Sequence, residues 1–395
     1  GVGINIHNYQ FLKNNSILTL LKLRTNYGQT GKVNFPPYAA STIYKTNLEN
    51  WYSSGYGVSL MALGNKRLTW EKTNSLDVGI EFEIMNGLLY TKATYYNKQT
   101  VDLISDVTIP SSSGFTSYKD NLGEIENVGF EIDLRSDIIR TKDWAVSIFG
   151  NLAHNKGKIK KISDSLKEYN DKVNDYYTDY STDTEDLMKP LLKYEAGQSL
   201  TSIWGMQSLG IDPLTGQDML LNRDGSISYN YTPENQIVIG DEEPTAQGAF
   251  GVNVRYKGFS LFASFMYEFG AQTYNETLVS KVENVDLSIW NADKRVLTDR
   301  WQKAGDHAKY KSIKDFSKTT KPVSRFVQDK NELKLSSLTL GYDFNGHSWL
   351  KKAYLSSLRV EFNVNDIMHL SSVKKERGLS YPFANTMGFN IKVGF

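Results

Sequence analysis

The sequence predicts an all-β protein whose strands form an antiparallel transmembrane β-barrel. Apolar and polar residues alternate one by one in many segments, which indicates strands rather than helices. Short and long connections alternate between these segments. No run approaches the ~18 consecutive apolar residues that a membrane helix needs. In the closing stretch, FANTMGFNIKVGF, the odd-numbered residues from Met387 to Phe395 are apolar, and the even-numbered ones are glycine, asparagine or lysine.

Ten segments are predicted to be strands that cross the bilayer, because a tilted crossing strand needs only ~9–11 residues. They are residues 17–27, 68–84, 88–109, 119–138, 144–162, 247–256, 259–272, 331–344, 355–368 and 383–395. The first leads into a long loop and the last follows one, so the number of crossings must be even. Residues 200–246 therefore contribute either no crossing or a pair, and the pattern leaves both open.

The lengths of the connections predict which end of the barrel is periplasmic and which is extracellular. Short ones fall at 85–87, 139–143, 256–259 and 345–354, and long ones at 28–67, 163–199, 275–330 and 369–382. Membrane β-barrels have short periplasmic turns and long external loops. Residues 1–395 are thus expected to form one barrel domain with four long extracellular loops, including a solvated acidic loop at 164–187.

Composition and motifs argue against several other functions. The formal charge is only +1, so no overall basic field is present to hold nucleic acid. Cysteine is absent, which excludes disulfides and thiolate-bound metals. The five histidines show no HExxH spacing and no serine lies in a GxSxG motif. We therefore expect no enzyme activity, catalytic residue, metal or cofactor; IDPLTGQD (211–218) and NRDGSIS (222–228) are expected to be turns.

Nine stretches, in this order, resemble the C-terminal barrel of the SusC/RagA-like TonB-dependent transporters. They are LKLRTNYGQTG (21–31), LTWEKTNSLDVGIEF (68–82), YYNKQTVDLI (95–104), IPSSSGFTSYKDNLGEIENVGFEIDL (109–134), IDPLTGQ (211–217), YKGFSLFASF (256–265), RWQKAGD (300–306), LKLSSLTLGYDF (333–344) and the terminal MGFNIKVGF. The resemblance implies a plugged barrel of about 22 strands. This chain would supply the last ten to twelve strands, and the N-terminal plug and TonB box would lie outside it.

The resemblance also implies a function. Such transporters import glycan or peptide fragments across the outer membrane of Gram-negative bacteria of the Bacteroidota type. They act with a SusD-like surface lipoprotein as a lid and draw energy through TonB. Two alternatives stay open: a passive porin or adhesin built on a similar barrel, and a soluble β-rich carbohydrate-binding module.

Candidate site residues fall into three groups. Aromatic residues in the long loops are candidates to stack on sugar rings or peptide side chains, or else to anchor their loops: Trp51, Tyr52, Tyr56, Tyr176, Tyr177, Trp204 and Trp290. Polar strand residues expected to face the lumen are Glu131, Asp133, Arg135, Asn390 and Lys392. Phe395 is expected to be the signal for outer-membrane assembly, and its strand to pair with a first strand upstream of Gly1. Trp301 is expected to organise its loop.

Overall fold

The computed structural model describes most of the chain. The described residues are 1–13, 15–33, 40–52, 55–62, 64–108, 117–121, 123–178, 186–288, 293–315, 319–374 and 386–395. Among them, no helix has both the length and the apolar composition to cross a bilayer.

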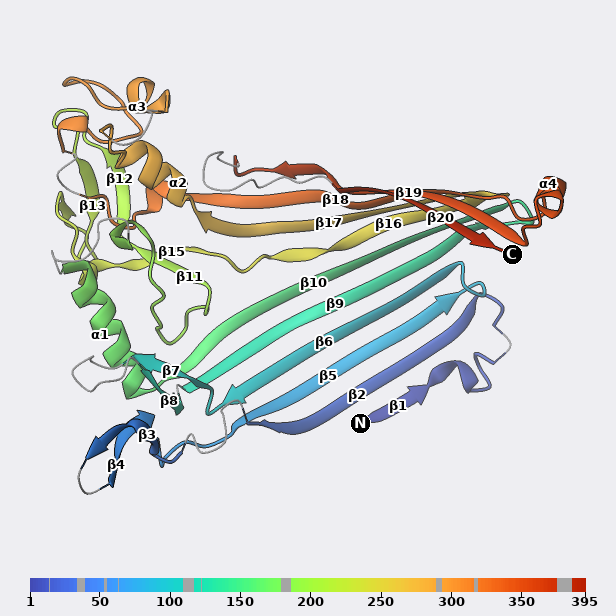
Figure 1. The fold of residues 1–395 in the computed structure, drawn as a ribbon, viewed down its shortest axis with the longest axis horizontal. Coiled ribbons are helices and arrows are strands. Elements are labelled where there is room, and N and C mark those ends of the chain that lie inside the picture. Colours follow the sequence, from blue (N-terminus) through green and yellow to red (C-terminus); the bar gives the residue numbers. More distant parts are fainter. Residues whose placement is uncertain are drawn as a thin grey trace.

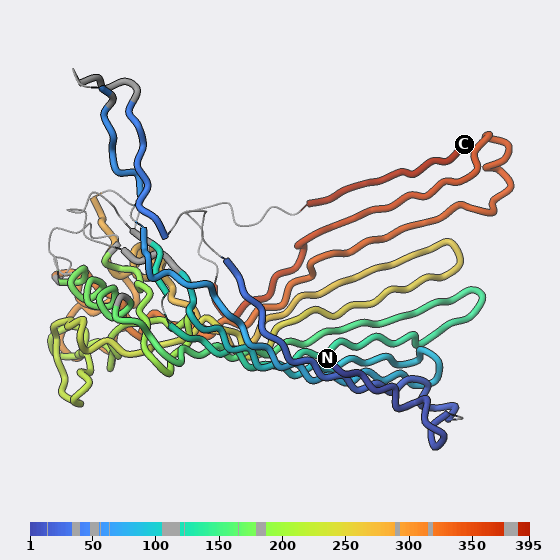
Figure 2. The backbone as a smooth tube through the Cα atoms, turned by 90° about the horizontal axis from the view of Figure 1, so that it is seen from below, coloured from blue at the N-terminus to red at the C-terminus, as the bar shows by residue number. Residues whose placement is uncertain are grey.

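One antiparallel sheet of eleven strands makes up most of the molecule (Figure 1). In spatial order its strands are β1 (Val2–Asn5), β2 (Leu18–Lys32), β5 (Glu71–Ile84), β6 (Leu89–Val101), β9 (Gly123–Arg140), β10 (Trp144–Ile162), β16 (Ala246–Tyr256), β17 (Phe259–Tyr274), β18 (Val327–Asp343), β19 (Ser357–Ser371) and β20 (Thr386–Gly394). Figure 2 shows their hairpin ends stacked in an arc from β2 to β20. The all-β prediction is confirmed, and all ten predicted strands are present.

Alternation along each strand gives this sheet two unlike faces. Cross-strand register places Val254, Leu261, Leu340 and Phe362 in one row. Leu340 and Phe362 are 47% and 39% exposed, so the row is not covered by other described residues. Because successive side chains point to opposite faces, the neighbouring row starting at Asn253 is on the other face. One face of the sheet is therefore apolar and uncovered, and the other is polar.

Tight connections gather at one end of the sheet, which we call the turn end. Between β5 and β6, Met85 and Asn86 adopt left-handed backbone angles (φ 49° and 52°) before Gly87 (φ 97°). The four residues 85–88 reverse the chain between the paired residues Ile84 and Leu89. Lys257 (φ 50°) takes the same conformation between β16 and β17. Helix α4 (Ser348–Lys352) lies in the connection from β18 to β19, at the right of Figure 1.

Long connections gather at the opposite end, which we call the loop end, and carry the remaining elements. The strands there are β3 (Ile43–Tyr52), β4 (Gly55–Ala62), β7 (Ile104–Thr108), β8 (Ser117–Asn121), β11 (Ser202–Gly205), β12 (Gln207–Ile211), β13 (Asp218–Leu221), β14 (Ile227–Ser228) and β15 (Ile237–Asp241). The α-helices there are α1 (Asp164–Thr178), α2 (Glu276–Leu278) and α3 (Arg295–Thr298), and a π-helical turn follows at Val279–Glu283. Short 3-10 turns lie at Asp186–Met188, Pro233–Asn235, Ile313–Asp315 and Ser324–Phe326, and one more, at Ile6–Asn8, follows β1.

The structure decides the assignment of residues 200–246. Strands β11 and β15 pair with each other, and β12 to β14 form a second small sheet, so this segment adds no strand to the large sheet. The pair of extra crossings is thereby excluded for this region. The even count of ten long strands is kept, and β1 pairs with β2 at the edge.

Three sequence expectations need correction. The solvated loop at 164–187 is instead largely helix α1, whose Val173 is 5% exposed. The strand predicted over 88–109 ends at Val101, because Asp102 turns with φ 57° and β7 then pairs with β8 as a separate hairpin. Strand β2 continues to Lys32 and β18 begins at Val327, so two loops are shorter than predicted.

The largest buried cluster lies at the loop end rather than under the sheet. We call it the loop core, and it consists of Met188, Ile203, Met206, Leu220, Tyr274, Leu278, Val279, Val282, Val296, Tyr310, Val323 and Phe326. These residues come from segments as far apart as 188 and 326. Burial of apolar area at roughly 25 cal/mol per Å² stabilises their association. The loop end is therefore a packed assembly with its own core.

Candidate functional site

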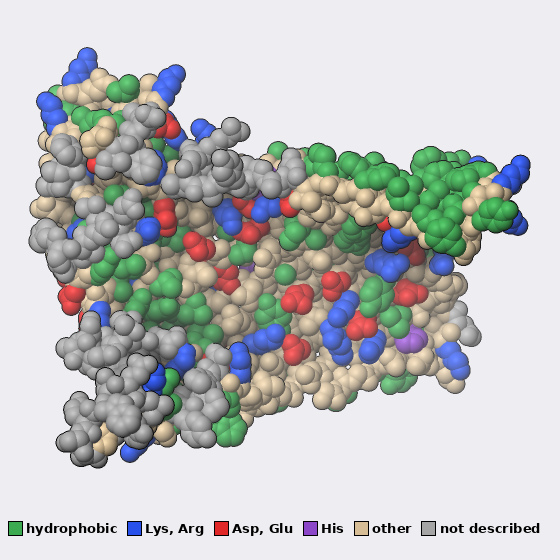
Figure 3. Space-filling model, in the orientation of Figure 1, with side chains coloured by type: hydrophobic (Ala, Val, Ile, Leu, Met, Phe, Trp, Pro, Cys, Tyr) green, Lys and Arg blue, Asp and Glu red, His purple; other side chains and the backbone are tan. Residues whose placement is uncertain are grey.

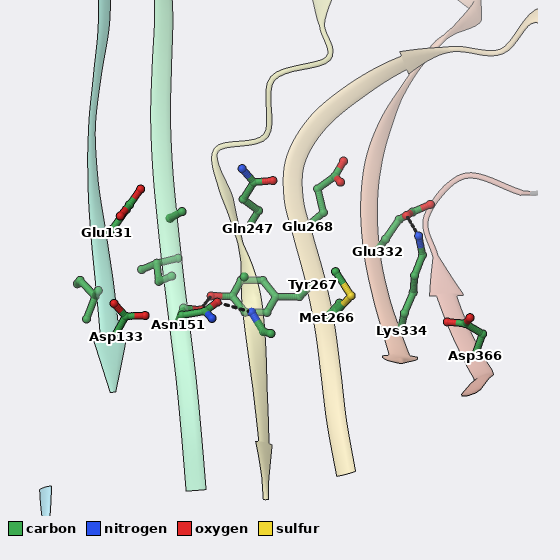
Figure 4. A pocket seen from close by; sticks show the side chains of 15 residues that line it. Glu131, Asp133, Asn151, Gln247, Met266, Tyr267, Glu268, Glu332, Lys334 and Asp366 are labelled. Carbon is green, nitrogen blue, oxygen red and sulfur yellow. Dashed lines mark hydrogen bonds and ion pairs between the residues drawn. The ribbon is translucent and has the colours of Figure 1, made fainter. Parts of the chain in front are cut away.

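The polar face of the sheet carries a hollow of about 640 Å³, and we call the surface that lines it the polar wall. Its charged and amide side chains are Glu131, Asp133, Asn151, Gln247, Glu268, Glu332, Lys334 and Asp366. They come from six neighbouring strands, β9, β10 and β16 to β19, with Ala249 and Met266 between them. Figure 4 shows these side chains side by side across the strands.

Strand register explains why these residues meet. Glu131 lies opposite Ala153, which is followed across the sheet by Gln247, Glu268 and Glu332. The next row toward the turn end runs from Asp133 through Asn151 to Lys334 in the same way. Residues two apart on a strand share a face. The alternation seen in VGFEIDL thus places both predicted residues, Glu131 and Asp133, in the wall of one hollow.

Five carboxylates and one lysine line the hollow, so its charge is mainly negative. Lys334 Nζ lies 3.0 Å from Glu332 Oε2, and Lys330 Nζ lies 2.9 Å from Glu268 Oε1. His369 Nε2 lies 3.4 Å from Glu332 Oε1. A surface with this excess of one sign attracts groups of the opposite sign.

Basic residues stand at the same level on the strands toward β2. Arg24 Nε lies 3.5 Å and Lys22 Nζ 3.9 Å from the carboxylate of Glu81. Arg24 also donates to Thr94 Oγ1 at 2.7 Å. Figure 3 shows both signs of charge spread over the middle of the sheet. The polar face of the sheet thus changes from mixed charge near β2 to predominantly acidic at the polar wall.

The other predicted polar residues lie nearer the turn end or the edge. Arg135 Nε lies 3.9 Å from Asp137 Oδ1, and the Arg135 side chain is 70% exposed. Asn390 is the register partner of Glu361, and Lys392 Nζ lies 3.8 Å from Glu361 Oε2. Both therefore share the polar face with Glu361. Phe395 follows β20 and is 94% exposed; its role in assembly stays a prediction.

Two of the predicted loop aromatics are packing residues. Tyr177 is 1% and Trp204 2% exposed. The Tyr177 hydroxyl donates to Lys189 O at 2.6 Å and accepts from Leu191 N at 2.9 Å, and burial raises the pKa of this hydroxyl. The Trp204 ring lies 5.5 Å from Lys193 Nζ. Their faces are covered by the chain itself, so in this arrangement neither ring presents a surface to a ligand.

Of the remaining aromatic candidates, only Tyr176 has a side chain in the described part of the structure. Tyr176 is half-buried and lies edge-on to Tyr177, with ring centroids 6.0 Å apart. Trp290 lies outside the described residues. Trp51 and Tyr52 lie in β3 and Tyr56 in β4, but their side chains are outside the described part of the structure. Ligand contact by these residues stays a prediction.

The two turns predicted from Asp and Gly residues are present. Asp212 Oδ1 accepts from Leu214 N at 2.9 Å, and this amide, with the Thr215 hydroxyl, holds the pKa of Asp212 below its usual range. Gly216 has φ 72°, and a Cβ there would lie 2.5 Å from the Trp301 ring. Trp301 Nε1 donates to Pro213 O at 2.9 Å, which confirms its structural role. No trio of His, Asp or Glu at metal-binding spacing occurs among the described residues.

A buried ion cluster at the loop end was not predicted from the sequence. Arg325 Nη2 lies 2.6 Å from Asp218 Oδ2 and 2.8 Å from Glu283 Oε1. Burial opposes the charge of Arg325, but Glu283 and Asp218 raise its pKa above the usual value. Burial raises the pKa of Asp218. These residues are 107 and 42 positions from Arg325, so no local pattern connects them.

Known proteins share this fold and sequence pattern. The family model described as "TonB dependent receptor-like, beta-barrel" matches residues 8–367. TonB-dependent receptor P39 of Formosa agariphila is 23% identical over 426 residues, covering 100% of this chain and 39% of that protein. TonB-dependent receptor SusC of Bacteroides thetaiotaomicron is 32% identical over 183 residues, covering 44% of this chain and 18% of that protein.

Solved structures agree on the architecture. The structure of the RagAB peptide importer in the "open-open" state matches with a TM-score of 0.76 at 22% identity, over 100% of this chain and 42% of that one. The structure of the RagAB peptide transporter matches with a TM-score of 0.75 at 23% identity, over 94% and 39%. At this identity the likeness concerns the fold. The two-faced antiparallel sheet and the match over residues 8–367 together show that the chain belongs to the TonB-dependent receptor-like β-barrel family.

Proposed function

We propose that this chain forms part of the wall of an outer-membrane transporter that imports oligomeric nutrients with energy delivered through TonB. The observation that carries the proposal is the sheet with one uncovered apolar face and one charged face that lines a hollow of about 640 Å³. An uncovered apolar face suits the hydrocarbon interior of the bilayer, which contains no water. The polar face of the sheet then faces the lumen, with the residues Glu131, Asp133, Arg135, Asn390 and Lys392.

The relatives named TonB-dependent receptors support the dependence on TonB. The chain spans 39% of the length of the Formosa receptor, so the plug and the TonB contact would come from elsewhere in the complete protein. The turn end lies in the periplasm and the packed loop end faces outward, where a SusD-like lipoprotein would cover it. The RagAB structures carry the description of a peptide importer, which makes peptides one substrate class to test beside glycans.

Uptake by whole cells tests the proposal. The complete gene is deleted from its host and restored, with and without a functional TonB, and labelled oligosaccharides and oligopeptides are offered separately. We expect one class to enter only with both the gene and TonB present, and to enter poorly when a neighbouring SusD-like gene is deleted. Equal uptake without TonB would instead mean a passive porin, and cell attachment without uptake an adhesin.

Extraction separates the membrane proposal from a soluble binding module. The complete protein is expected to stay in the membrane fraction after a high-salt or alkaline wash and to need detergent for release. Release by the wash alone would contradict the proposal, because the exposed apolar row that contains Leu340 and Phe362 would then have to face water.

A further inference from the structure

A groove of about 410 Å³ runs along the apolar face near the turn end, between β16 and β19. Its floor includes the row of Val254, Leu261, Leu340 and Phe362, which are register partners on four adjacent strands. This volume is within the ~300–1,000 Å³ of small-ligand sites. The side chains that line the groove are almost all apolar, so it suits a hydrocarbon chain.

Aromatic side chains close the groove on the side of the turns. Tyr256, Phe259 and Tyr342 form the next row, and the rings of Phe259 and Tyr342 lie 4.4 Å apart. Trp144 lies 4.3 Å from the ring of Tyr256 and extends this row toward β10. Tyrosine and tryptophan are enriched where hydrocarbon meets headgroups. The row marks that level on this face.

Lysines stand directly beyond the aromatic row. Lys257 Nζ lies 5.3 Å from the centroid of Tyr256, which places a cation at the lip of the groove. The backbone N–H of Lys257 donates to Asp143 O at 2.8 Å and so holds the neighbouring turn, with exposed Lys142, beside it.

Helix α4 adds two more cations from the next connection. The rings of Tyr342 and Phe344 meet edge to face at 4.6 Å, and those of Phe344 and Trp349 do so at 5.7 Å, which ties α4 to the aromatic row. Its last residues, Lys351 and Lys352, are exposed. Figure 3 shows the hydrophobic side chains gathered at this corner, with basic residues at its tip. The three connections at 141–143, 257–258 and 344–356 carry four lysines and one aspartate.

We propose that the groove and these lysines form a binding site for one anionic phospholipid. An acyl chain lies in the groove, and Lys257, with Lys351 and Lys352, binds the headgroup phosphate. A free phosphate would leave the apolar groove unused, whereas a phospholipid matches both the groove and the charge beside it. The inference rests on the proposed membrane placement, in which the turn end lies in the periplasm and the groove beside it lies in the periplasmic leaflet.

Native mass spectrometry of the complete protein, released from detergent micelles, tests the site. The probes are phosphatidylglycerol and phosphatidylcholine with identical acyl chains. We expect phosphatidylglycerol to be retained preferentially. The triple variant Lys257→Gln/Lys351→Gln/Lys352→Gln should lose this preference. The ratio of retained phosphatidylglycerol to phosphatidylcholine should fall roughly fivefold for each lysine that lies near the headgroup. The variant Val360→Trp, which fills the groove, should reduce retention of both lipids while all lysines remain.

The matched control removes two lysines at the opposite end, Lys167→Gln/Lys172→Gln on α1, and should keep the wild-type preference. Heat-modifiable migration on gels confirms that each variant is a folded barrel. Equal retention of both lipids by the unaltered protein would overturn the proposal. The proposal would also be overturned if millimolar inorganic phosphate displaced the lipid and Val360→Trp did not change lipid retention. That result would indicate a site for free phosphate. TonB-dependent uptake is measured on the same proteins. If the unaltered protein shows no such uptake, the proposed function is wrong. If the triple variant keeps the lipid preference, only the proposed lipid site is wrong.

Discussion

Arg325 shows how much a single residue decides at the loop end. Its guanidinium bridges Asp218 and Glu283, whose side chains are 13% and 0% exposed. Arg325 Nη1 also donates to Lys309 O at 2.8 Å, so the same group joins three loop segments. A buried ion cluster stabilises little compared with an apolar replacement of the whole set, but loss of one member leaves uncompensated charge.

Substitution of this arginine should therefore destabilise the loop end. We expect Arg325→Met to lower its free energy of unfolding by about 3–5 kcal/mol, because two carboxylates remain buried without their cation. Hydrogen exchange of peptides covering 205–220 and 279–285 in the detergent-solubilised protein measures the change. The control Lys167→Met removes an exposed partner of Asp164 and should change exchange by less than about 0.5 kcal/mol. Equal protection in both variants would contradict the interpretation.

Asp212 predicts a local pH dependence. The pKa of its carboxyl is lowered in the folded turn by the Leu214 amide, so ionisation favours the turn at pH values above the unfolded pKa of about 3.9. This stabilisation is lost as the pH falls through the folded pKa. We expect residues 211–217 to open more as the pH falls from about 5 to about 3, measured by hydrogen exchange corrected for the intrinsic rate. The variant Asp212→Asn should lose that dependence, whereas Asp224→Asn, in the neighbouring turn, should keep it.

Among the elements, β20 shows the two-faced design most simply. Phe389 and Ile391 are 63% and 56% exposed on one face, and Asn390 and Lys392 share the other face with Glu361. The same division appears in β16 to β19, where Val254, Leu261, Leu340 and Phe362 share the apolar face. A strand can keep it only if its register stays in place, because a slip of one residue exchanges the faces.

A pair of adjacent arginine substitutions tests this division. We expect Phe389→Arg to reduce the folded, membrane-assembled fraction, because Phe389 pairs with Phe362, which lies deeper in the apolar face than the aromatic row. The cost of an arginine on the lipid face rises with depth, to about 2–4 kcal/mol at the midplane. Asn390→Arg places the same side chain one residue away on the polar face and should assemble almost normally. Heat-modifiable migration of the membrane fraction reports assembly. Normal assembly of both variants, or failure of both, would contradict the assigned faces.

For the whole molecule, the polar wall combines residues that no single hairpin contains. Glu131 and Asp133 on β9 lie beside Glu268 on β17 and Glu332 on β18 across the same hollow. We expect the excess of carboxylates to favour oligomers with positive groups over anionic ones of the same size. This expected preference would be a property of the assembled wall.

Neutralising part of the wall should change uptake by charge. We expect Glu131→Gln/Asp133→Asn to lower TonB-dependent uptake of a cationic oligopeptide several-fold while uptake of a matched neutral one changes little. The control Asp137→Asn removes a carboxylate from the same strand outside the hollow and should leave both unchanged. Competition assays with the two labelled peptides measure the ratio. An unchanged ratio in the double variant would mean that the wall does not select by charge.

The strands, their faces and the division into short and long connections were predictable from the sequence. The alternation of polar and apolar residues is a local property. The apolar residues on either side of Asp133, Ile132 and Leu134, are enough to assign Asp133 to the polar face. The tight turn near Met85 to Gly87 was also predictable, because asparagine and glycine favour turns and tolerate left-handed backbone angles.

Only the tertiary structure decided the rest. The segment 200–246 has strand-like stretches that pair among themselves, and Tyr177 and Trp204, which resembled binding residues, fill the packed loop end. The pairing of Arg325 with Asp218 and Glu283 and the lysines beside the groove depends on which distant loops meet. Local alternation determines which face a side chain occupies, but long-range packing determines what it meets there, and burial and ion pairing follow from that meeting.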